Sequence, residues 1–445
     1  MNLMVKTYRI TTLGCKVNQQ ESETLAAGFE KLSFVPARKG EPADICVINS
    51  CTVTSTADSK TRQRIRQARA ANPEALVCVI GCLPEIAREA VEAMPEVDLV
   101  VGSLEKERAA ALIMAAFAVE APSAHCRCST EDCVGEVFGN IRGSQCNSQS
   151  GSRLRADRRT RAMIKIEDGC DRFCSYCIVP YARGPVRSRP AEDVLSDAKE
   201  LISAGYKELV LTGVNLALYG RDRLETQKEP SLLCSLVEQV CEIEVGIEYR
   251  VRLGSLEPTA ISAEEAVRIA GIRGVCPQFH LSLQSGCEKT LKEMGRPYTP
   301  AGYTKIVQGL RALDPLFSIT TDVIVGFPGE SDEDFEESLE FVRSIGFSRA
   351  HVFKYSRRPG TRAAEMPGQV SETVKNERSR RMAEAAEESA ARFLEKNKGV
   401  SRRTLIYGPD KSGRFIRGLT DNGIDVLLPK GTGDHTLNSL VSVTL

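Results

Sequence analysis

The chain has 445 residues, 42% of them hydrophobic and 27% charged, which is an ordinary composition for a globular protein of several domains. Basic and acidic residues balance at 59 each, so a polyanion could bind only at local basic patches. Residues 1–8 lack a signal-peptide pattern and no apolar run is long enough to span a membrane, so we expect a cytoplasmic protein. Sixteen cysteines in that reducing compartment favour metal ligation or catalysis over disulfides.

The first region, residues 4–118, alternates short apolar strand patterns with helical ones. Helical patterns such as residues 21–32 and 57–71 separate the strands. This alternation predicts an α/β domain with a parallel sheet covered by helices. The expected strands are residues 8–13, 45–49, 76–81 and 97–101.

Three cysteines, Cys15, Cys51 and Cys82, each come shortly after one of these strands. The carboxyl ends of parallel strands lie at one edge of a sheet, so three thiols that are far apart in the sequence should converge there. Gly14 and Gly81 precede two of them and allow the backbone to approach a ligand closely. The topology therefore predicts a three-cysteine site in this domain.

Residues 119–155 interrupt the strand and helix patterns. This stretch is rich in Ser, Gly and Arg and has no clear period, which is typical of a linker between domains. It contains four cysteines whose spacing fits no zinc ribbon, and the sequence leaves open whether they bind anything. They are Cys126, Cys128, Cys133 and Cys146.

The alternation returns in residues 156–388, where six strand–helix units are expected. Eight such units make a complete barrel, so six predict a partial (β/α)6 barrel that is open on one side. Polar or glycine-rich segments, which include Glu257 and Gln284, follow the strands at the end where β/α barrels place their active sites. The expected strands are residues 162–167, 207–211, 249–253, 278–283, 319–325 and 350–355.

A cysteine motif follows the first of these strands, with Cys170, Cys174 and Cys177 at spacings of four and three residues. A cluster that only carries electrons usually has four cysteine ligands. Three thiols instead leave one iron open to bind a small molecule. The motif therefore indicates chemistry at an iron–sulfur cluster rather than electron storage.

The last region, residues 390–445, changes to short β patterns separated by turn residues, which predict a small antiparallel β-barrel. From Arg392 onward it has nine Lys or Arg and five Asp or Glu, so this end is basic although the whole chain is neutral. Small basic β-barrels often bind RNA, and a capping domain with a solvated charged face is the alternative. The expected strands are residues 404–407, 414–420, 424–428 and 440–445.

Together these motifs resemble the methylthiotransferase family of radical S-adenosylmethionine enzymes. The cysteine motif at residues 170–177 resembles the superfamily signature, and the last region, with Gly418-Leu-Thr-Asp-Asn-Gly, resembles a TRAM domain. Three upstream segments resemble the N-terminal domain of the methylthiotransferases: Thr12-Leu-Gly-Cys-Lys-Val-Asn, Asn49-Ser-Cys-Thr-Val-Thr and Ile80-Gly-Cys-Leu-Pro. The resemblance covers nearly the whole chain except the linker, and Gln20 and Gly254 depart from the expected pattern.

The resemblance implies two 4Fe-4S clusters. Cys170, Cys174 and Cys177 would hold the cluster that binds S-adenosylmethionine, whereas Cys15, Cys51 and Cys82 would hold an auxiliary cluster that supplies sulfur. Tyr176, Glu257 and Gln284 are the expected contacts to S-adenosylmethionine. The alternative for Tyr176 is a wall residue, and for Glu257 and Gln284 it is a buried salt-bridge or turn role. The radical chemistry takes place at the clusters, so no catalytic side chain is assigned.

The resemblance is greatest to the branch that adds a methylthio group to C2 of N6-threonylcarbamoyladenosine next to the tRNA anticodon. The stretches that favour this branch are Thr12 to Gln19 and Cys177 to Arg189. It implies tRNA as a partner, together with an electron donor and a sulfur donor. The alternatives are methylthiolation of N6-isopentenyladenosine in tRNA or of a ribosomal-protein aspartate, and a non-enzymatic iron–sulfur protein that binds RNA or transfers electrons.

Overall fold

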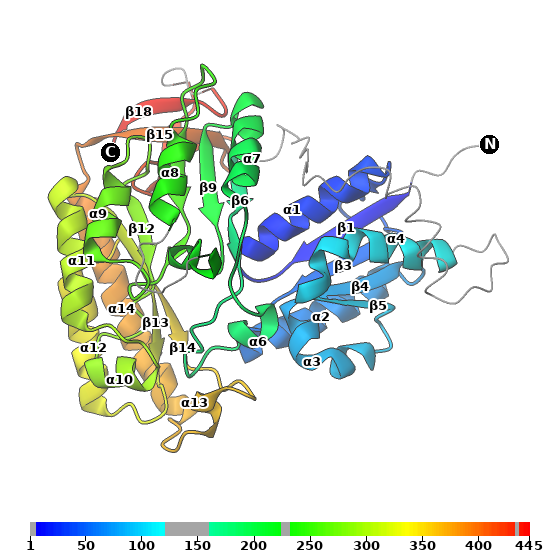
Figure 1. Ribbon diagram of the computed structural model, residues 1–445, viewed down its shortest axis with the longest axis horizontal. Coiled ribbons are helices and arrows are strands. Elements are labelled where there is room, and N and C mark those ends of the chain that lie inside the picture. The colour runs from blue at the N-terminus through cyan, green and yellow to red at the C-terminus, as the bar shows by residue number, and fades with distance from the viewer. Residues whose placement is uncertain (1–5, 121–159, 224–231, 432–435) are drawn as a thin grey trace. The chain divides into compact units, whose positions relative to one another are not determined.

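The computed structural model describes residues 6–120, 160–223, 232–431 and 436–445 (Figure 1). These residues form two compact units: the first contains residues 6–120 together with Ile178–Gly184, and the second contains the remainder. The barrel and the C-terminal sheet fall within one unit, and the domain boundaries inferred from the sequence stay predictions. The four linker cysteines, Cys126, Cys128, Cys133 and Cys146, lie outside the described residues.

The first unit has a five-stranded parallel sheet with the strand order β2-β1-β3-β4-β5. The parallel sheet predicted for this region is thereby confirmed, and β2 is a short edge strand that the sequence patterns did not indicate. The strands are β1 (Thr7–Thr12), β2 (Val35–Pro36), β3 (Ile45–Ser50), β4 (Leu76–Gly81) and β5 (Leu99–Gly102).

Helices cover both faces of this sheet. The helices are α1 (Lys16–Lys31), α2 (Ser55–Ala71), α3 (Cys82–Glu92), α4 (Ala109–Glu120), the 3-10 helix η1 (Ser103–Arg108) and the short α6 (Val179–Arg183). Alternate residues of β3 and β4 point to opposite faces, so Val47 packs with α1 and α4 whereas Ile48 packs with α2 and α3. Both faces of β3 and β4 are buried, which is why these strands read as continuous apolar runs.

The second unit contains a partial barrel made of two parallel sheets, with the orders β10-β9-β6 and β11-β12-β13-β14. A single residue, Gly254, separates β10 from β11, so the strands form six successive positions and the predicted fold class is confirmed. The strands are β6 (Arg161–Lys165), β9 (Glu208–Thr212), β10 (Arg250–Leu253), β11 (Ser255–Leu256), β12 (Gln278–Leu281), β13 (Ser318–Val325) and β14 (Arg349–Lys354). The pair β7 (Glu167–Asp168) and β8 (Arg187–Ser188) is antiparallel.

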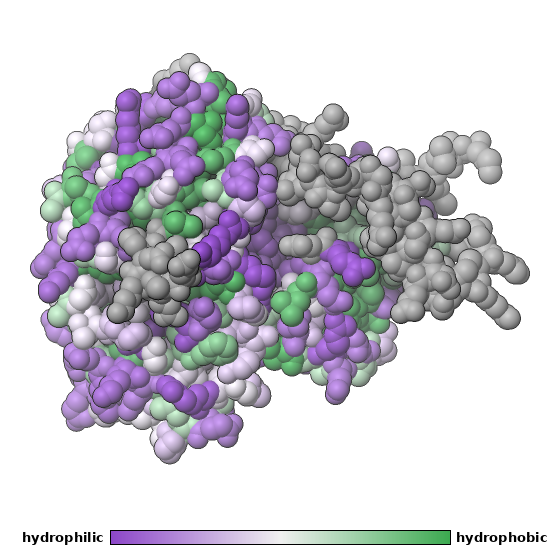
Figure 2. Space-filling model, viewed as in Figure 1, coloured by the Kyte–Doolittle hydropathy of each residue, from purple (hydrophilic) through white to green (hydrophobic). Residues whose placement is uncertain are grey.

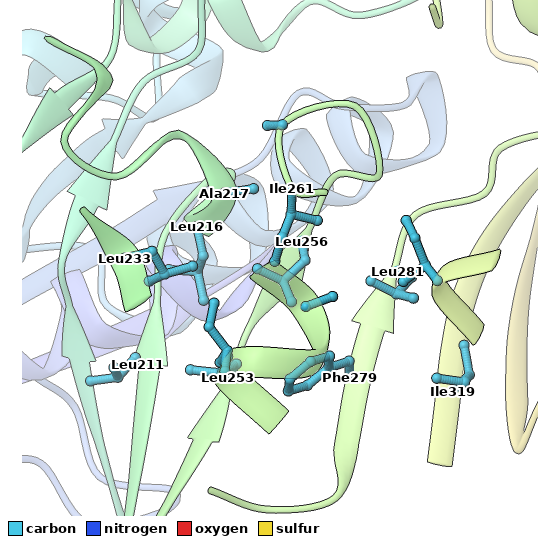
Figure 3. Close-up of a cluster of buried hydrophobic side chains, with 14 of the residues drawn as sticks. Leu211, Leu216, Ala217, Leu233, Leu253, Leu256, Ile261, Phe279, Leu281 and Ile319 are labelled. Carbon is cyan, nitrogen blue, oxygen red and sulfur yellow. The ribbon is translucent and has the colours of Figure 1, made fainter. Parts of the chain in front are cut away.

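Helices pack against the outer face of the barrel strands and form the main core of this unit. Figure 3 shows side chains from successive strands gathered in one layer, among them Leu211, Leu253, Phe279 and Ile319. The helices are α7 (Ala191–Ser203), η2 (Leu216–Leu218), η3 (Arg221–Arg223), α8 (Leu233–Cys241), α9 (Ala263–Gly271), α10 (Glu288–Glu293), α11 (Pro300–Leu313), α12 (Asp332–Ile345), α13 (Arg362–Glu365) and α14 (Glu372–Lys396).

Four antiparallel strands in the order β17-β16-β15-β18 close the chain. They are β15 (Ser401–Pro409), β16 (Phe415–Thr420), β17 (Asp425–Pro429) and β18 (Leu440–Thr444). The antiparallel strands expected for the small β-barrel are confirmed, and the described strands form one four-stranded sheet. Within the second unit, buried arginines of β10 attach this sheet to the barrel, because Arg250 donates to the carbonyls of Arg403 and Leu419 at 2.7 and 2.9 Å.

Hydrophilic residues are interspersed with hydrophobic ones over the visible part of the described surface (Figure 2). None of the helices in the described ranges combines the length and the apolar character that crossing a membrane requires.

Candidate functional site

The three upstream cysteines lie where the first unit offers a ligand site. Cys15 is the N-cap of α1 after β1, Cys51 directly follows β3, and Cys82 begins α3 after β4. Strands β1 and β3 are neighbours, but the helices that follow them cover opposite faces of the sheet. Ligands of open α/β sheets bind in the crevice outside the carboxyl ends of the strands at such a switch point.

Two glycines allow the three cysteine loops to come together. Gly14 has a φ of +102°, and a Cβ atom there would lie 2.8 Å from Cβ and 3.1 Å from Sγ of Cys51. Gly81, with a φ of +104°, would place a Cβ atom 2.6 Å from the carbonyl oxygen of Ser50. Residues that carry a side chain rarely adopt these φ values. Glycine is therefore required at both positions for this close approach.

Asn18 organises the backbone around Cys15 and Cys51. Its Nδ2 donates to the carbonyls of Leu13 at 2.9 Å and Ser50 at 2.8 Å, and the Cys15 thiol lies 3.5 Å from its Oδ1. Arg183 of α6, in the same unit, donates to this Oδ1 at 2.6 Å. No role at this site was predicted for Asn18 or Arg183, although Asn18 follows Cys15 by one helical turn.

Glu21 completes this polar support. Its carboxylate accepts from Arg183 Nη1 at 3.1 Å and from Lys106 Nζ at 2.7 Å, and all three side chains are largely buried. A buried cation needs such a partner. The ion pair with Glu21 keeps the Arg183 guanidinium in place beside Asn18.

The thiols of this site are chemically suited to an iron–sulfur cluster. Burial raises the pKa of Cys51 to about 11, and the charges of Cys82 and Cys15 add to that rise. Ionisation of the Cys51 thiol therefore needs added positive charge, which iron supplies. Across the described ranges, no three His, Cys, Asp or Glu side chains converge on a single ion. Three thiols with a fourth position left open suit a 4Fe-4S cluster, in which each thiolate binds a different iron.

The second cysteine motif lies on a loop at the carboxyl end of the barrel strands. Ser175, within the motif, donates through its backbone N–H to the Met294 carbonyl at 2.9 Å and through Oγ to the Glu293 carbonyl at 2.8 Å. Its own carbonyl accepts from the Ala363 N–H at 2.7 Å. The residues that follow α10 and those that begin α13 thus fix the middle of the loop.

The thiols of this loop also lie close to one another. Burial raises the pKa of Cys170 to about 12, and the charges of Cys177 and Cys174 contribute to the rise. Burial likewise raises the pKa of Cys174, against the opposing charge of Arg296. Burial therefore favours the neutral thiol at Cys170 and Cys174, and a cluster would supply the positive charge that ionises them.

Glu257 lies at the centre of a charged group beside this loop. Its carboxylate is 3.1 Å from Arg172 Nε and 2.8 Å from Arg296 Nη1, and it accepts from Asn215 Nδ2 at 3.3 Å. Arg296 also donates to the Tyr176 hydroxyl at 2.8 Å. The structure therefore brings the expected contacts Tyr176 and Glu257 together through an arginine that the sequence analysis missed. The Gly-Arg-Pro turn after α10 was the available signal for Arg296.

Gln284 is held by its backbone against β13. Its φ is +65°, its N–H donates to the Asp322 carbonyl at 2.8 Å, and its carbonyl accepts from the Ile324 N–H at 2.8 Å. The side chain is buried. Asn215 is also buried, and its Oδ1 has no hydrogen-bond partner among the described residues. An unused acceptor beside the cysteine loop fits a small polar ligand such as S-adenosylmethionine.

Comparisons with known proteins agree with this geometry. Residues 7–102 match the family described as Uncharacterized protein family UPF0004, and residues 164–342 match the Radical SAM superfamily. The radical S-adenosylmethionine methyltransferase TsrM from Kitasatospora setae, solved with cobalamin and a [4Fe-4S] cluster, has a TM-score of 0.57 at 13% identity, over 81% of this chain and 77% of that chain. This likeness shows a shared fold.

Curated relatives extend over most of the chain. The threonylcarbamoyladenosine tRNA methylthiotransferase MtaB of Thermotoga maritima is 37% identical over 90% of this chain and 86% of its own length, and that of Bacillus subtilis is 36% identical over 96% and 91%. A tRNA-2-methylthio-N(6)-dimethylallyladenosine synthase of Pelotomaculum thermopropionicum is 34% identical over 99% and 95%. The chain therefore belongs to the tRNA methylthiotransferase family of radical S-adenosylmethionine enzymes.

Proposed function

We propose that this protein adds a methylthio group to C2 of N6-threonylcarbamoyladenosine next to the anticodon of tRNA. The observation that carries the proposal is the presence of two separate three-cysteine sites in a chain that aligns along 90–99% of its length with four relatives of that name. One site suits radical generation, and a second cluster suits delivery of sulfur. We place the reaction in the cytoplasm, with tRNA as the macromolecular partner.

We assign Cys170, Cys174 and Cys177 as ligands of one 4Fe-4S cluster and Cys15, Cys51 and Cys82 as ligands of the other. The clusters supply one-electron chemistry and sulfur, for which an external electron donor and a sulfur donor are required. The protein's part is to hold each set of three thiols and to leave a fourth position open.

For S-adenosylmethionine we retain Tyr176, Glu257 and Gln284 as proposed contacts and add Asn215 and Arg296. Arg296 carries positive charge beside Tyr176, where it suits a carboxylate. The Glu257 carboxylate is already bound to two arginines, so we propose that its main role is to orient Arg296.

The C-terminal sheet, which resembles a TRAM domain, is our proposed RNA grip. Not every basic residue there is available, because Arg402 pairs with Asp314 at 2.8 Å and Arg403 pairs with Glu248. Lys411, Arg414 and Arg417 are exposed. These three are the proposed phosphate contacts, which would give affinity without reading sequence.

Mass analysis of tRNA nucleosides from cells with and without the gene tests the proposal. We expect the methylthio derivative of threonylcarbamoyladenosine to disappear without the gene and to return with the wild-type gene but not with Cys51→Ala. Loss of only the dimethylallyl derivative would move the protein to the other tRNA branch. Unchanged tRNA nucleosides would reject a tRNA substrate and leave the ribosomal-protein alternative.

A further inference from the structure

One face of the sheet β12-β13-β14 is polar and remains accessible in the described structure. Buried residues of these strands, such as Phe279 and Val323, pack against α11, α12 and α14. The residues of opposite parity point to the other side, the interior of the partial barrel. Those residues are His280 on β12, Thr320 and Asp322 on β13, and Arg349 and His351 on β14, and we call them the polar wall.

The register of the strands brings these side chains together. Thr320 is the paired partner of both His280 and Arg349, and Asp322 is paired with His351. His280 Nδ1 lies 3.0 Å from Thr320 Oγ1, and its Nε2 lies 3.2 Å from Asp322 Oδ2. The imidazole rings of His280 and His351 are 6.4 Å apart. Both histidines of the described ranges therefore belong to one cluster.

Further hydrogen bonds hold the inner side of this wall. Gln278 Nε2 donates to Thr320 Oγ1 at 3.3 Å, and Arg252 donates to Gln278 Oε1 at 3.1 Å. Arg252 in turn donates to the Thr420 carbonyl of the C-terminal sheet at 3.0 Å. Such a chain fixes the orientation of His280 and Asp322 before a ligand arrives, which lowers the entropic cost of binding.

The wall is open to a ligand from the β14 side. The side chains of His280 and Asp322 are 14% and 30% exposed. Arg349 and His351 are exposed residues, and Arg349 forms only a long, solvent-exposed ion pair of 3.9 Å with Asp425 of β17. Ile324, two residues beyond Asp322 on the same face, packs in one apolar cluster with Tyr176 of the cysteine motif. Two residues of strand span about 7 Å. The Asp322 end of the wall therefore lies about 7 Å along β13 from Ile324, the residue that packs with Tyr176.

The wall contains a carboxylate acceptor, Asp322, a cationic donor, Arg349, and two imidazole rings. A threonylcarbamoyl group offers urea N–H and hydroxyl donors as well as a carboxylate. A dimethylallyl group is a hydrocarbon and would offer no donor to Asp322 and no acceptor to Arg349 once water is displaced. A site built to hydrogen-bond one substituent rejects an analogue that lacks those groups far more strongly than an apolar pocket does.

We propose that the polar wall binds the threonylcarbamoyl group on N6 of the target adenosine. Asp322 accepts from its N–H or O–H groups, and His351 and Arg349 donate to its carboxylate. This assignment rests on the proposed function and identifies the residues that select that substrate over a dimethylallyl adenosine.

The test measures the affinity of the cluster-loaded, full-length protein for anticodon stem-loop RNAs that differ only at N6, carrying a threonylcarbamoyl group, a dimethylallyl group or hydrogen. We expect Asp322→Asn and His351→Leu each to weaken binding of the threonylcarbamoyl RNA about 10- to 100-fold, which is the loss expected for one charge-assisted hydrogen bond. Binding of the unmodified RNA should not change. RNA-independent cleavage of S-adenosylmethionine and iron content should stay at wild-type levels.

Lys354→Gln is the matched control, because Lys354 lies on β14 but pairs with Glu372 of α14 at 2.9 Å on the other side of the strand. It should leave the preference among the three RNAs unchanged. If Asp322→Asn does not fold, His351→Leu and Arg349→Gln test the wall assignment instead. Both positions are exposed on an edge strand, so these substitutions should not disturb folding.

The experiment distinguishes a failure of the wall assignment from a failure of the proposed substrate. A wild-type protein that methylthiolates the threonylcarbamoyl RNA, with variants that keep its full preference, would overturn the wall assignment alone. A wild-type protein that prefers the dimethylallyl RNA would overturn both the wall assignment and the proposed substrate.

Discussion

Glu208 should be the most important buried carboxylate for the stability of the second unit, and Glu208→Gln tests this directly. Its side chain is fully buried at the start of β9, where its carboxylate accepts from Arg250 at 2.6 Å and from Arg252 at 2.9 Å. Arg161 lies 3.8 Å away. The same two β10 arginines donate to carbonyls of the C-terminal sheet, so Glu208 supports the attachment between that sheet and the barrel.

The expected loss of folding stability in Glu208→Gln follows from the pKa of Glu208. Burial alone raises this pKa, but the charges of Arg252 and Arg250 and a hydrogen bond from Arg252 outweigh burial and lower it from 4.5 to about 2. A depressed carboxyl pKa stabilises the fold above the unfolded-state value of 4.5, and this stability is lost as the pH falls towards 2. At neutral pH the difference corresponds to roughly 3 kcal/mol. This agrees with the roughly 3–5 kcal/mol typical of breaking a buried ion pair.

Urea unfolding of the full-length apo chain, followed by circular dichroism at pH 7, measures the effect. Glu208→Gln should lower the free energy of unfolding by about 3 kcal/mol at pH 7. At pH 3.5, below the unfolded-state pKa, the difference in unfolding free energy between wild type and variant should be smaller by about 1 kcal/mol. Glu238→Gln is the control, since its ion pair with Arg268 is exposed; it should not shift the midpoint. Equal midpoints for Glu208→Gln and the wild type, or a gap that does not depend on pH, would refute the reasoning.

Three further outcomes concern the cysteine sites. Gly14→Ala should disrupt the first cysteine site, because the new Cβ would lie 2.8 Å from Cys51 Cβ. Iron content should fall by about half, since only one of two similar clusters should be lost. Gly40→Ala, with a φ of +90° and no neighbour within 4 Å, should keep its iron, and equal iron in both variants would contradict the steric argument. Cys51→Ala should abolish methylthiolation but retain cleavage of S-adenosylmethionine, so full activity with full iron content would disprove its role. Arg296→Ala should raise the KM for S-adenosylmethionine about tenfold at unchanged iron content, and an unchanged KM in 5′-deoxyadenosine assays would remove it from the binding site.

The sequence was sufficient to predict the parallel sheet of the first unit and the approach of its three cysteines. Each strand there is buried on both faces, so it appears in the sequence as a short apolar run. The position of Cys15, Cys51 and Cys82 after those runs then follows from the rule for parallel sheets. The pattern did not indicate the two-residue edge strand β2, because so short a segment has no period to detect.

The polar surroundings of the second site were harder to predict. Glu257 stood out because it follows a strand, but its partner Arg296 follows a short helix and is 39 positions away in the sequence. Only the closure of the barrel brings them within 2.8 Å. Asp322 was ambiguous for a related reason. Its strand is apolar on one face and mixed on the other, so the sequence could not show which way the carboxylate points.

The two cysteine sets differ in the side chains that surround them. The first set depends on glycines that let loops meet at a sheet edge, and the polar side chains beside it, Asn18 and Arg183, are bound to each other and to the loop backbone. The second set lies beside Glu257, Arg296 and Asn215, which can orient a charged small molecule. A site that must cleave a cofactor needs those orienting groups, whereas a site that delivers an atom needs mainly an open ligand position. The residues around each set therefore favour assigning S-adenosylmethionine to the barrel and sulfur delivery to the first unit.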